Sequence, residues 1–232
     1  MQACPPRINS VDEVEAALAV TRAVVAGAGA TPPTPEERIQ LVDALFIYTP
    51  KLDRVKTACT RAPGHPPMDL TEFYYREAPI LLMAVGAYAE SDVVSELLRH
   101  PGMTTPGVLE AVPQSVFAPG VPPGVHHGRG ETALMLAVRQ GNFEVASLLL
   151  ASGASPLAAR LDNGDTVLHC VGANTVFSHE QEQCAKVVID FCLATGQPLD
   201  VPNLVGETPI AAARRRRHDG VVHLFEAAGV KE

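Results

Sequence analysis

One glycine-bounded pattern constrains the fold of this chain more than any other feature. Residues 130–153, GETALMLAVRQGNFEVASLLLASG, hold two short apolar runs at helical spacing, which Gly141 and Asn142 separate. The pattern predicts two antiparallel helices joined by a tight turn, and Gly153 is typical of the cap that ends a helix. Because two such helices cannot bury both apolar faces on their own, they need similar pairs as neighbours.

The same pattern occurs twice more. Residues 206–229 have the same length and the same Gly-Glu-Thr opening, and residues 164–196 open with Gly-Asp-Thr-Val-Leu-His. The opening glycines Gly130 and Gly164 are 34 residues apart, and Gly206 follows 42 residues later, which is 33 plus a nine-residue insertion around 176–184. A period of this length indicates a stack of helix pairs that share one continuous core.

The period and its motif residues resemble the ankyrin repeat. The resemblance is carried by Thr132, Thr166-Val167-Leu168-His169 and Thr208-Pro209-Ile210. We therefore expect an all-α fold, an ankyrin-type helical solenoid with an N-terminal helical cap and a long inter-repeat finger. The resemblance also implies a structural role for His169, because the imidazole at this motif position hydrogen-bonds the backbone of adjacent repeats.

We expect four segments along the chain. Residues 1–70 form an N-terminal helical cap or a degenerate repeat, with a first helix over residues 11–26 that begins at a capping box. Residues 71–102 form a divergent ankyrin repeat, in which Ala78 and Pro79 stand at the usual Thr-Pro position. Residues 103–128 are a Pro- and Gly-rich finger with a short helix around 108–112, and residues 129–232 are three ankyrin repeats, the middle one with an insertion.

Composition and charge narrow the class of protein. The net charge of −8 argues against nucleic-acid binding, which usually needs a basic domain. No apolar run is long enough to span a membrane, and the N-terminal residues do not have the pattern of a secretory signal. Five scattered cysteines do not indicate a disulfide framework. We therefore expect an intracellular protein, in the cytoplasm or nucleus, or in a host cell if a pathogen or virus delivers it.

The resemblance implies that the chain binds another protein, because ankyrin stacks usually use their turn tips and inner helices, which line a concave face. By their position in the repeats, the candidate binding residues are Tyr74, Tyr75, Arg76, Arg129, Glu131, Arg139, Gln140, Asp162, Asn163, Asp165, Asn174, Leu204, Glu207, Arg215 and Arg216.

Four consecutive arginines at residues 214–217 are the most prominent charge run. They could form a nuclear-import signal or a patch for an acidic partner. The structural alternative, which we favour, is a solvated helix end, since cations suit the C-terminus of a helix.

The sequence contains little that indicates a metal or cofactor. Five side chains that could bind a metal lack the paired spacing of a structural zinc site: His169, Cys170, His179, Cys184 and Cys192. We expect no metal and no cofactor.

One alternative function is a small-molecule-binding protein, or a metal-independent enzyme of the cyclisation or isomerisation type. The finger and the insertion would then fold over the concave face and enclose a pocket. The residues that could line it are Tyr74, Tyr75, His126, His127 and His169. A third hypothesis is inhibition of an enzyme by insertion of the finger into its active site. We favour a protein-interaction module over an enzyme.

Overall fold

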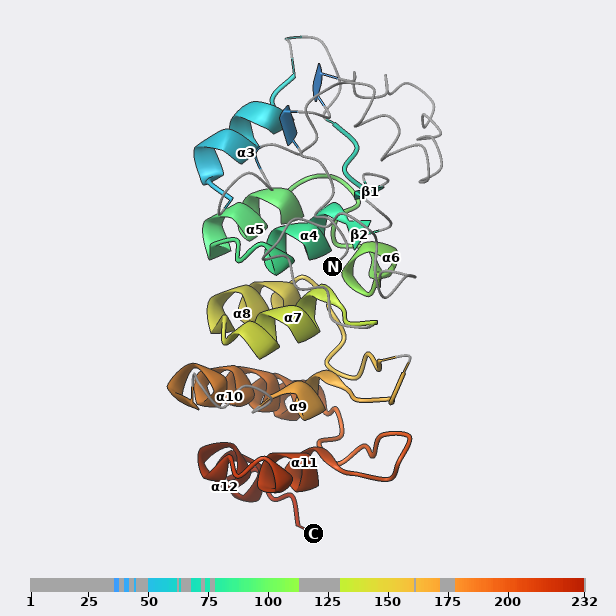
Figure 1. The fold of residues 1–232 in the computed structure, drawn as a ribbon, viewed down its shortest axis with the longest axis vertical. Coiled ribbons are helices and arrows are strands. Elements are labelled where there is room, and N and C mark those ends of the chain that lie inside the picture. Colours follow the sequence, from blue (N-terminus) through green and yellow to red (C-terminus); the bar gives the residue numbers. More distant parts are fainter. Residues whose placement is uncertain are drawn as a thin grey trace, which may run out of the picture. The chain divides into compact units, whose positions relative to one another are not determined.

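The chain folds into helix pairs, seen here in a computed structural model (Figure 1). It separates into two compact units, residues 1–127 and residues 128–232. The structure describes residues 36–37, 40–41, 44, 50–61, 63, 68–71, 74–75, 78–112, 130–160, 162–171 and 178–231. The predicted helix over residues 11–26 and most of the predicted finger lie outside these residues.

The first unit contains α3 (Leu52–Cys59), α4 (Ile80–Gly86), α5 (Ser91–Leu98) and α6 (Pro106–Leu109). The two-residue strands β1 (Tyr74–Tyr75) and β2 (Ala78–Pro79) pair antiparallel and lead into α4. Helix α5 packs against both α3 and α4. Within the predicted finger, residues 103–112 carry α6, and Met103 and Leu109 there are buried, so this part packs into the first unit.

Helix α4 has the same backbone frame as two helices of the second unit. In each case the residue just before the helix and a residue with positive φ after it are nine positions apart: 79 and 88, 132 and 141, and 208 and 217. The residue that precedes α4 is Pro79, not Ala78, so the predicted alignment of Ala78 and Pro79 with Thr-Pro is wrong by one residue. Ala78 and Pro79 are in the extended conformation of β2, so the helix begins only at Ile80.

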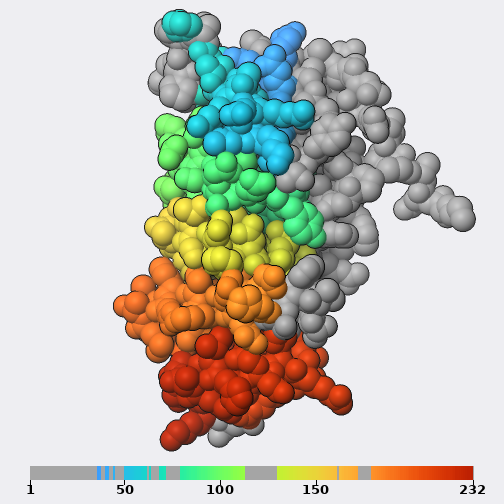
Figure 2. Space-filling model, turned by 90° about the vertical axis from the view of Figure 1, so that its left-hand side faces the viewer, coloured from blue at the N-terminus to red at the C-terminus, as the bar shows by residue number. Residues whose placement is uncertain are grey.

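The second unit contains three helix pairs, α7 (Ala133–Gln140) with α8 (Phe143–Ala151), α9 (Val167–Cys170) with α10 (Ser178–Thr195), and α11 (Pro209–Arg215) with α12 (Asp219–Ala227). The first helices of the pairs contact one another in the order α7, α9, α11, and the second helices contact one another in the order α8, α10, α12. The unit is therefore a two-layer stack, whose pairs follow one another as yellow, orange and red bands in Figure 2.

Threonines begin the first helix of each pair. The Thr132 hydroxyl accepts a hydrogen bond from the Met135 amide, and Thr208 caps α11 in the same way (3.3 Å in both). These contacts satisfy amides that have no partner within the helix. The opening Gly-Glu-Thr or Gly-Asp-Thr of each repeat is thus a turn followed by a helix cap.

The middle pair contains a long second helix. Residues 178–184 of the predicted insertion belong to α10, so the part of the insertion that the structure describes lengthens this helix. Gln181, in the extra turns, is fully buried and donates to the carbonyl oxygens of Val138 (2.9 Å) and Arg139 (3.1 Å). A side chain of the middle pair thereby caps the C-terminus of α7 in the preceding pair.

Candidate binding surface

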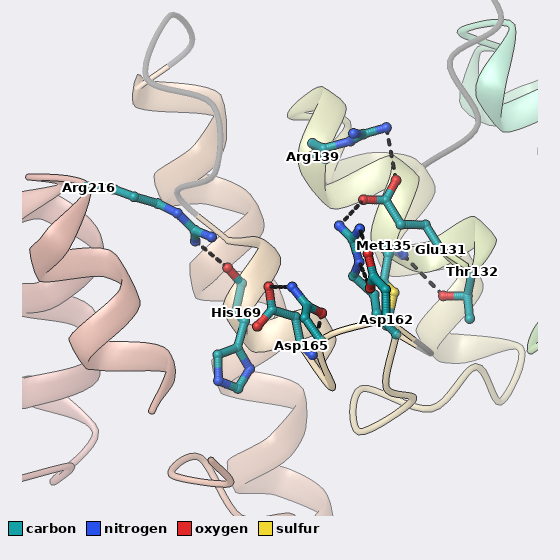
Figure 3. Close-up of polar contacts among 10 residues, drawn as sticks. Glu131, Thr132, Met135, Arg139, Asp162, Asp165, His169 and Arg216 are labelled. Atoms are coloured by element: carbon teal, nitrogen blue, oxygen red, sulfur yellow. Dashed lines mark hydrogen bonds and ion pairs between the residues drawn. The ribbon is translucent and has the colours of Figure 1, made fainter. Parts of the chain in front are cut away.

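An ion cluster around the buried Glu131 lies where the first two tips of the second unit meet (Figure 3). Glu131, before α7, is 1% exposed and lies between two arginines: Oε2 is 2.9 Å from Arg139, and Oε1 accepts a hydrogen bond of 2.9 Å from Arg160. Arg160 also holds Asp162 through two hydrogen bonds of 3.0 and 2.8 Å. The cluster joins two repeats, because Arg160 comes 29 residues after Glu131.

The two carboxylates of the cluster differ in their environment. Burial raises the pKa of Glu131, and the two arginines offset this only in part. Oε2 makes no hydrogen bond among the described residues, although it forms the ion pair with Arg139. Asp162 is exposed, and the hydrogen bonds from Arg160 lower its pKa.

The second and third tips are joined by amide side chains and backbone. Asn203 is buried and donates to Asp165 Oδ1 at 2.7 Å, while its own Oδ1 accepts from the amides of Val205 and Glu207. The Leu204 amide donates to the Asn163 carbonyl of the preceding tip at 3.0 Å. The backbone of the last tip is therefore held by hydrogen bonds to its own repeat and to its neighbour.

His169 joins the middle and last repeats from within the core. Its ring is fully buried, and Nδ1 accepts a hydrogen bond from the Thr166 amide at 3.1 Å. Because Nδ1 accepts, Nε2 carries the proton, and it donates to the Glu207 carbonyl of the next repeat at 2.9 Å. The expected structural role is confirmed. With both ring nitrogens bound to backbone, this imidazole is not available for a pocket or a metal.

Three of the four arginines in the run donate hydrogen bonds to other groups of the fold, so the run is more than the solvated helix end that we favoured. Arg214 donates to Glu226 at 2.8 Å, and Arg215 donates to Glu207 at 2.6 and 3.0 Å, which lowers the pKa of that carboxyl. Arg216 donates to the His169 carbonyl at the end of α9 (Figure 3). It therefore caps a helix of the preceding repeat, as Gln181 does for α7. Arg217 is exposed.

We use the name tip surface for the tips of the second unit and the ends of α7 and α11 beside them. It consists of Glu131, Arg139, Arg160, Asp162, Asn163, Asp165, Asn203, Leu204, Val205, Glu207, Arg215 and Arg216. Of the predicted binding residues in it, Glu131 and Asp165 are buried and brace the tips, whereas Leu204, Asp162 and Arg215 are exposed. Gln140, at the end of α7, is partly exposed.

Several predicted site residues cannot be placed. Arg76, His126, His127, Arg129 and Asn174 lie outside the described residues. Tyr74 and Tyr75 form β1 of the first unit, whereas His169 belongs to the second.

Sequence reasoning missed Arg160, Gln181 and Asn203. A signal existed for Gln181, because it falls in register with the buried face of α10, with Cys184, Val188 and Cys192. A polar residue in an apolar stripe indicates a buried amide that needs hydrogen-bond partners.

The cysteines of the described residues are buried free thiols. Burial raises the pKa of Cys59, Cys170 and Cys184 to about 12 and that of Cys192 to about 11. Since the thiolate is the reactive form, these side chains act as small core residues.

Comparison with known proteins agrees with this geometry. A family model described as ankyrin repeats, in three copies, matches residues 81–175. Among solved structures, the chain is similar to the crystal structure of the ankyrin repeat domain of Bcl-3, a member of the IkappaB protein family, with a TM-score of 0.50 and 21% sequence identity. The match covers 75% of this chain and 60% of that chain, and it concerns the fold alone.

Two further findings bear on the class of protein. In the part of the chain that the structure describes, no helix has the length and apolar character that a membrane crossing requires. Ankyrin repeats in general mediate protein–protein interaction. The helix pairs, their threonine caps, the bridging histidine and the family match agree, so the predicted ankyrin-type all-α solenoid is confirmed, and residues 81–175 match the ankyrin-repeat family.

Proposed function

We propose that this chain is a protein-interaction module whose second unit binds a partner protein through the tip surface. The observation that carries the proposal is the continuous hydrogen bonding of the three tips. Glu131 and Arg160 join the first tip to the second, and Asp165 and Asn203 join the second to the third. A surface that is rigid before binding loses less conformational entropy when a partner arrives.

Exposure of specific side chains on this rigid backbone supports the proposal. Leu204 is 74% exposed and Val205 is 81% exposed, on a tip whose backbone is fixed by Asn203. The equivalent positions of the preceding tip, counted from the opening glycine, are Asp162 and Asn163. Two adjacent apolar side chains exposed at a tip suit a contact with a partner, since contiguous exposed apolar side chains can form part of an interaction site.

Site-specific photo-crosslinking of the full chain tests the proposal. One variant carries benzoylphenylalanine in place of Val205, and a matched variant carries it in place of Leu193, which is 53% exposed on α10. Each tagged chain is expressed in its native cells, irradiated and purified, and the crosslinked proteins are identified by mass spectrometry. We expect a stoichiometric partner from position 205 alone. The same proteins from both positions, or a partner from position 193 only, would contradict binding at the tip surface.

A further inference from the structure

The charges at the last repeat of the tip surface are arranged asymmetrically. Arg215 is 61% exposed, whereas its partner Glu207 is 21% exposed, so the guanidinium faces solvent and the carboxylate lies beneath it. The same order occurs in the first repeat, where Arg139 is 35% exposed above Glu131, which is 1% exposed. Asp162 is the exception, and Arg160 binds both of its oxygens.

The end of α11 also carries more cations than carboxylates. The four arginines, residues 214–217, outnumber the three carboxylates of the same repeat, Glu207, Asp219 and Glu226, of which Glu207 pairs with Arg215 and Glu226 with Arg214. Arg216 hydrogen-bonds a neutral carbonyl, so that contact does not cancel its charge. Residues 206–229, with four arginines and three carboxylates, thus have a local excess of one positive charge on a chain whose net charge is −8. Such a local field favours partners of opposite charge and speeds their association.

An apolar contact lies beside these cations. The exposed Leu204 and Val205 precede Glu207 by three and two residues, and Glu207 is bound to Arg215 by two hydrogen bonds. Helix α11 contains seven residues and is about 10 Å long, and the Arg215 side chain at its end reaches back to Glu207 just before its start. That length corresponds to about three residues of an extended peptide.

The geometry points to an acidic protein segment as the occupant of this repeat: an extended stretch that places an apolar side chain on Leu204 and Val205 and carboxylates on Arg215 and Arg216. The inference rests on the proposed function and specifies the chemistry of the partner. An extended segment fits because it can contact the tip and the helix end together. Its carboxylates would form charge-assisted hydrogen bonds with the guanidinium groups.

Selection from a random 12-residue peptide library, displayed on phage against the immobilised full chain, tests the inference. We expect enrichment of peptides with an apolar residue within about three positions of Asp or Glu, and these peptides should crosslink to the chain that carries benzoylphenylalanine in place of Val205. Basic or uncharged peptides that crosslink there would overturn the acidic inference and leave the proposed function standing. Selected peptides that crosslink only from position 193 would contradict both.

Matched variants then measure the two contacts by fluorescence anisotropy of a selected peptide. Arg215→Gln should weaken binding about three- to tenfold, whereas Lys186→Gln, which removes a 64% exposed cation from α10, should leave it unchanged. Leu204→Ser should weaken binding about tenfold, and Leu193→Ser should not. Equal losses in a variant and its control would refute the assignment. Displacement of the peptide by an oligoadenylate of equal length at lower concentration would also refute it, in favour of a nucleic acid.

Discussion

Replacing Gly164 with alanine tests whether adjacent tips are in close contact. Gly164 has a φ of +73°, and a Cβ there would lie 2.7 Å from Leu204 Cγ and 2.9 Å from the Leu204 amide nitrogen. The nitrogen cannot retreat easily, because it donates to the Asn163 carbonyl at 3.0 Å. Gly206 is a matched control, with a φ of +80° and no atom within 4 Å of its added Cβ.

Both substitutions place a side chain at positive φ, but only Gly164→Ala also creates a steric overlap. A side chain at positive φ costs roughly 1–2 kcal/mol, and the stiffer unfolded chain returns about 0.4–1 kcal/mol, so Gly206→Ala should lose about 1 kcal/mol of unfolding free energy. Gly164→Ala adds the overlap with Leu204, which costs about 1–3 kcal/mol in a packed site. We therefore expect a total loss of about 2–4 kcal/mol for Gly164→Ala.

Urea denaturation followed by circular dichroism measures both losses. A third variant separates the side-chain overlap from the backbone overlap: Leu204→Ala should be nearly neutral alone, because Leu204 is 74% exposed, but it should restore part of the loss in Gly164→Ala. Equal losses for Gly164→Ala and Gly206→Ala would refute the close contact between these tips.

Three further substitutions test the inter-repeat contacts and the backbone. His169→Leu should cost about 2–4 kcal/mol in urea denaturation, because it leaves the buried Thr166 amide without its acceptor and removes one of the two donors to the Glu207 carbonyl, the other being the Asn203 amide; a loss below about 1 kcal/mol would contradict the bridge. Arg217→Gly should raise the unfolding free energy by about 0.5–1 kcal/mol, since Arg217 has a φ of +60°, and destabilisation would show that its side chain contributes more than its backbone costs. For Glu131, the folded pKa is raised above its unfolded value, so its stabilising contribution is present below about pH 4.5 and is lost as pH rises through the folded pKa. The stability of the natural chain relative to Glu131→Gln should therefore fall as pH rises above about 4.5, and a rise in urea denaturation over that interval would contradict the raised pKa.

Local patterns were sufficient to predict the helix pairs of the second unit. Glycines at fixed spacing mark the turns, and Thr132 and Thr208 begin helices as their motif positions imply. Arg217 of the last repeat has the left-handed backbone conformation that Gly141 has in the first. These turns and helix caps depend only on residues close in the sequence, so the local sequence is sufficient to predict them.

Contacts between repeats were harder to predict. Glu131 was expected at an exposed tip, but Arg160 reaches it from the next repeat and the carboxylate is buried. Nothing local to Glu131 encodes the distance to a residue 29 positions later. No secondary structure was assigned to the insertion from its sequence, and the part that the structure describes is helix, because Gln181 and Cys184 extend the buried face of α10.

The capping of one repeat by side chains of the next limits how freely these units could be exchanged. Gln181 can form its hydrogen bonds only next to the end of α7, and Arg216 can form its hydrogen bond only next to the end of α9. Deleting the middle pair would remove the amide that binds Val138 and the histidine that binds Glu207 in one step. A transplanted middle pair would keep these hydrogen bonds only where the new neighbours place backbone carbonyl groups at the same positions. In this chain the smallest transferable piece is a run of neighbouring repeats, because the side chains that complete one helix belong to another repeat.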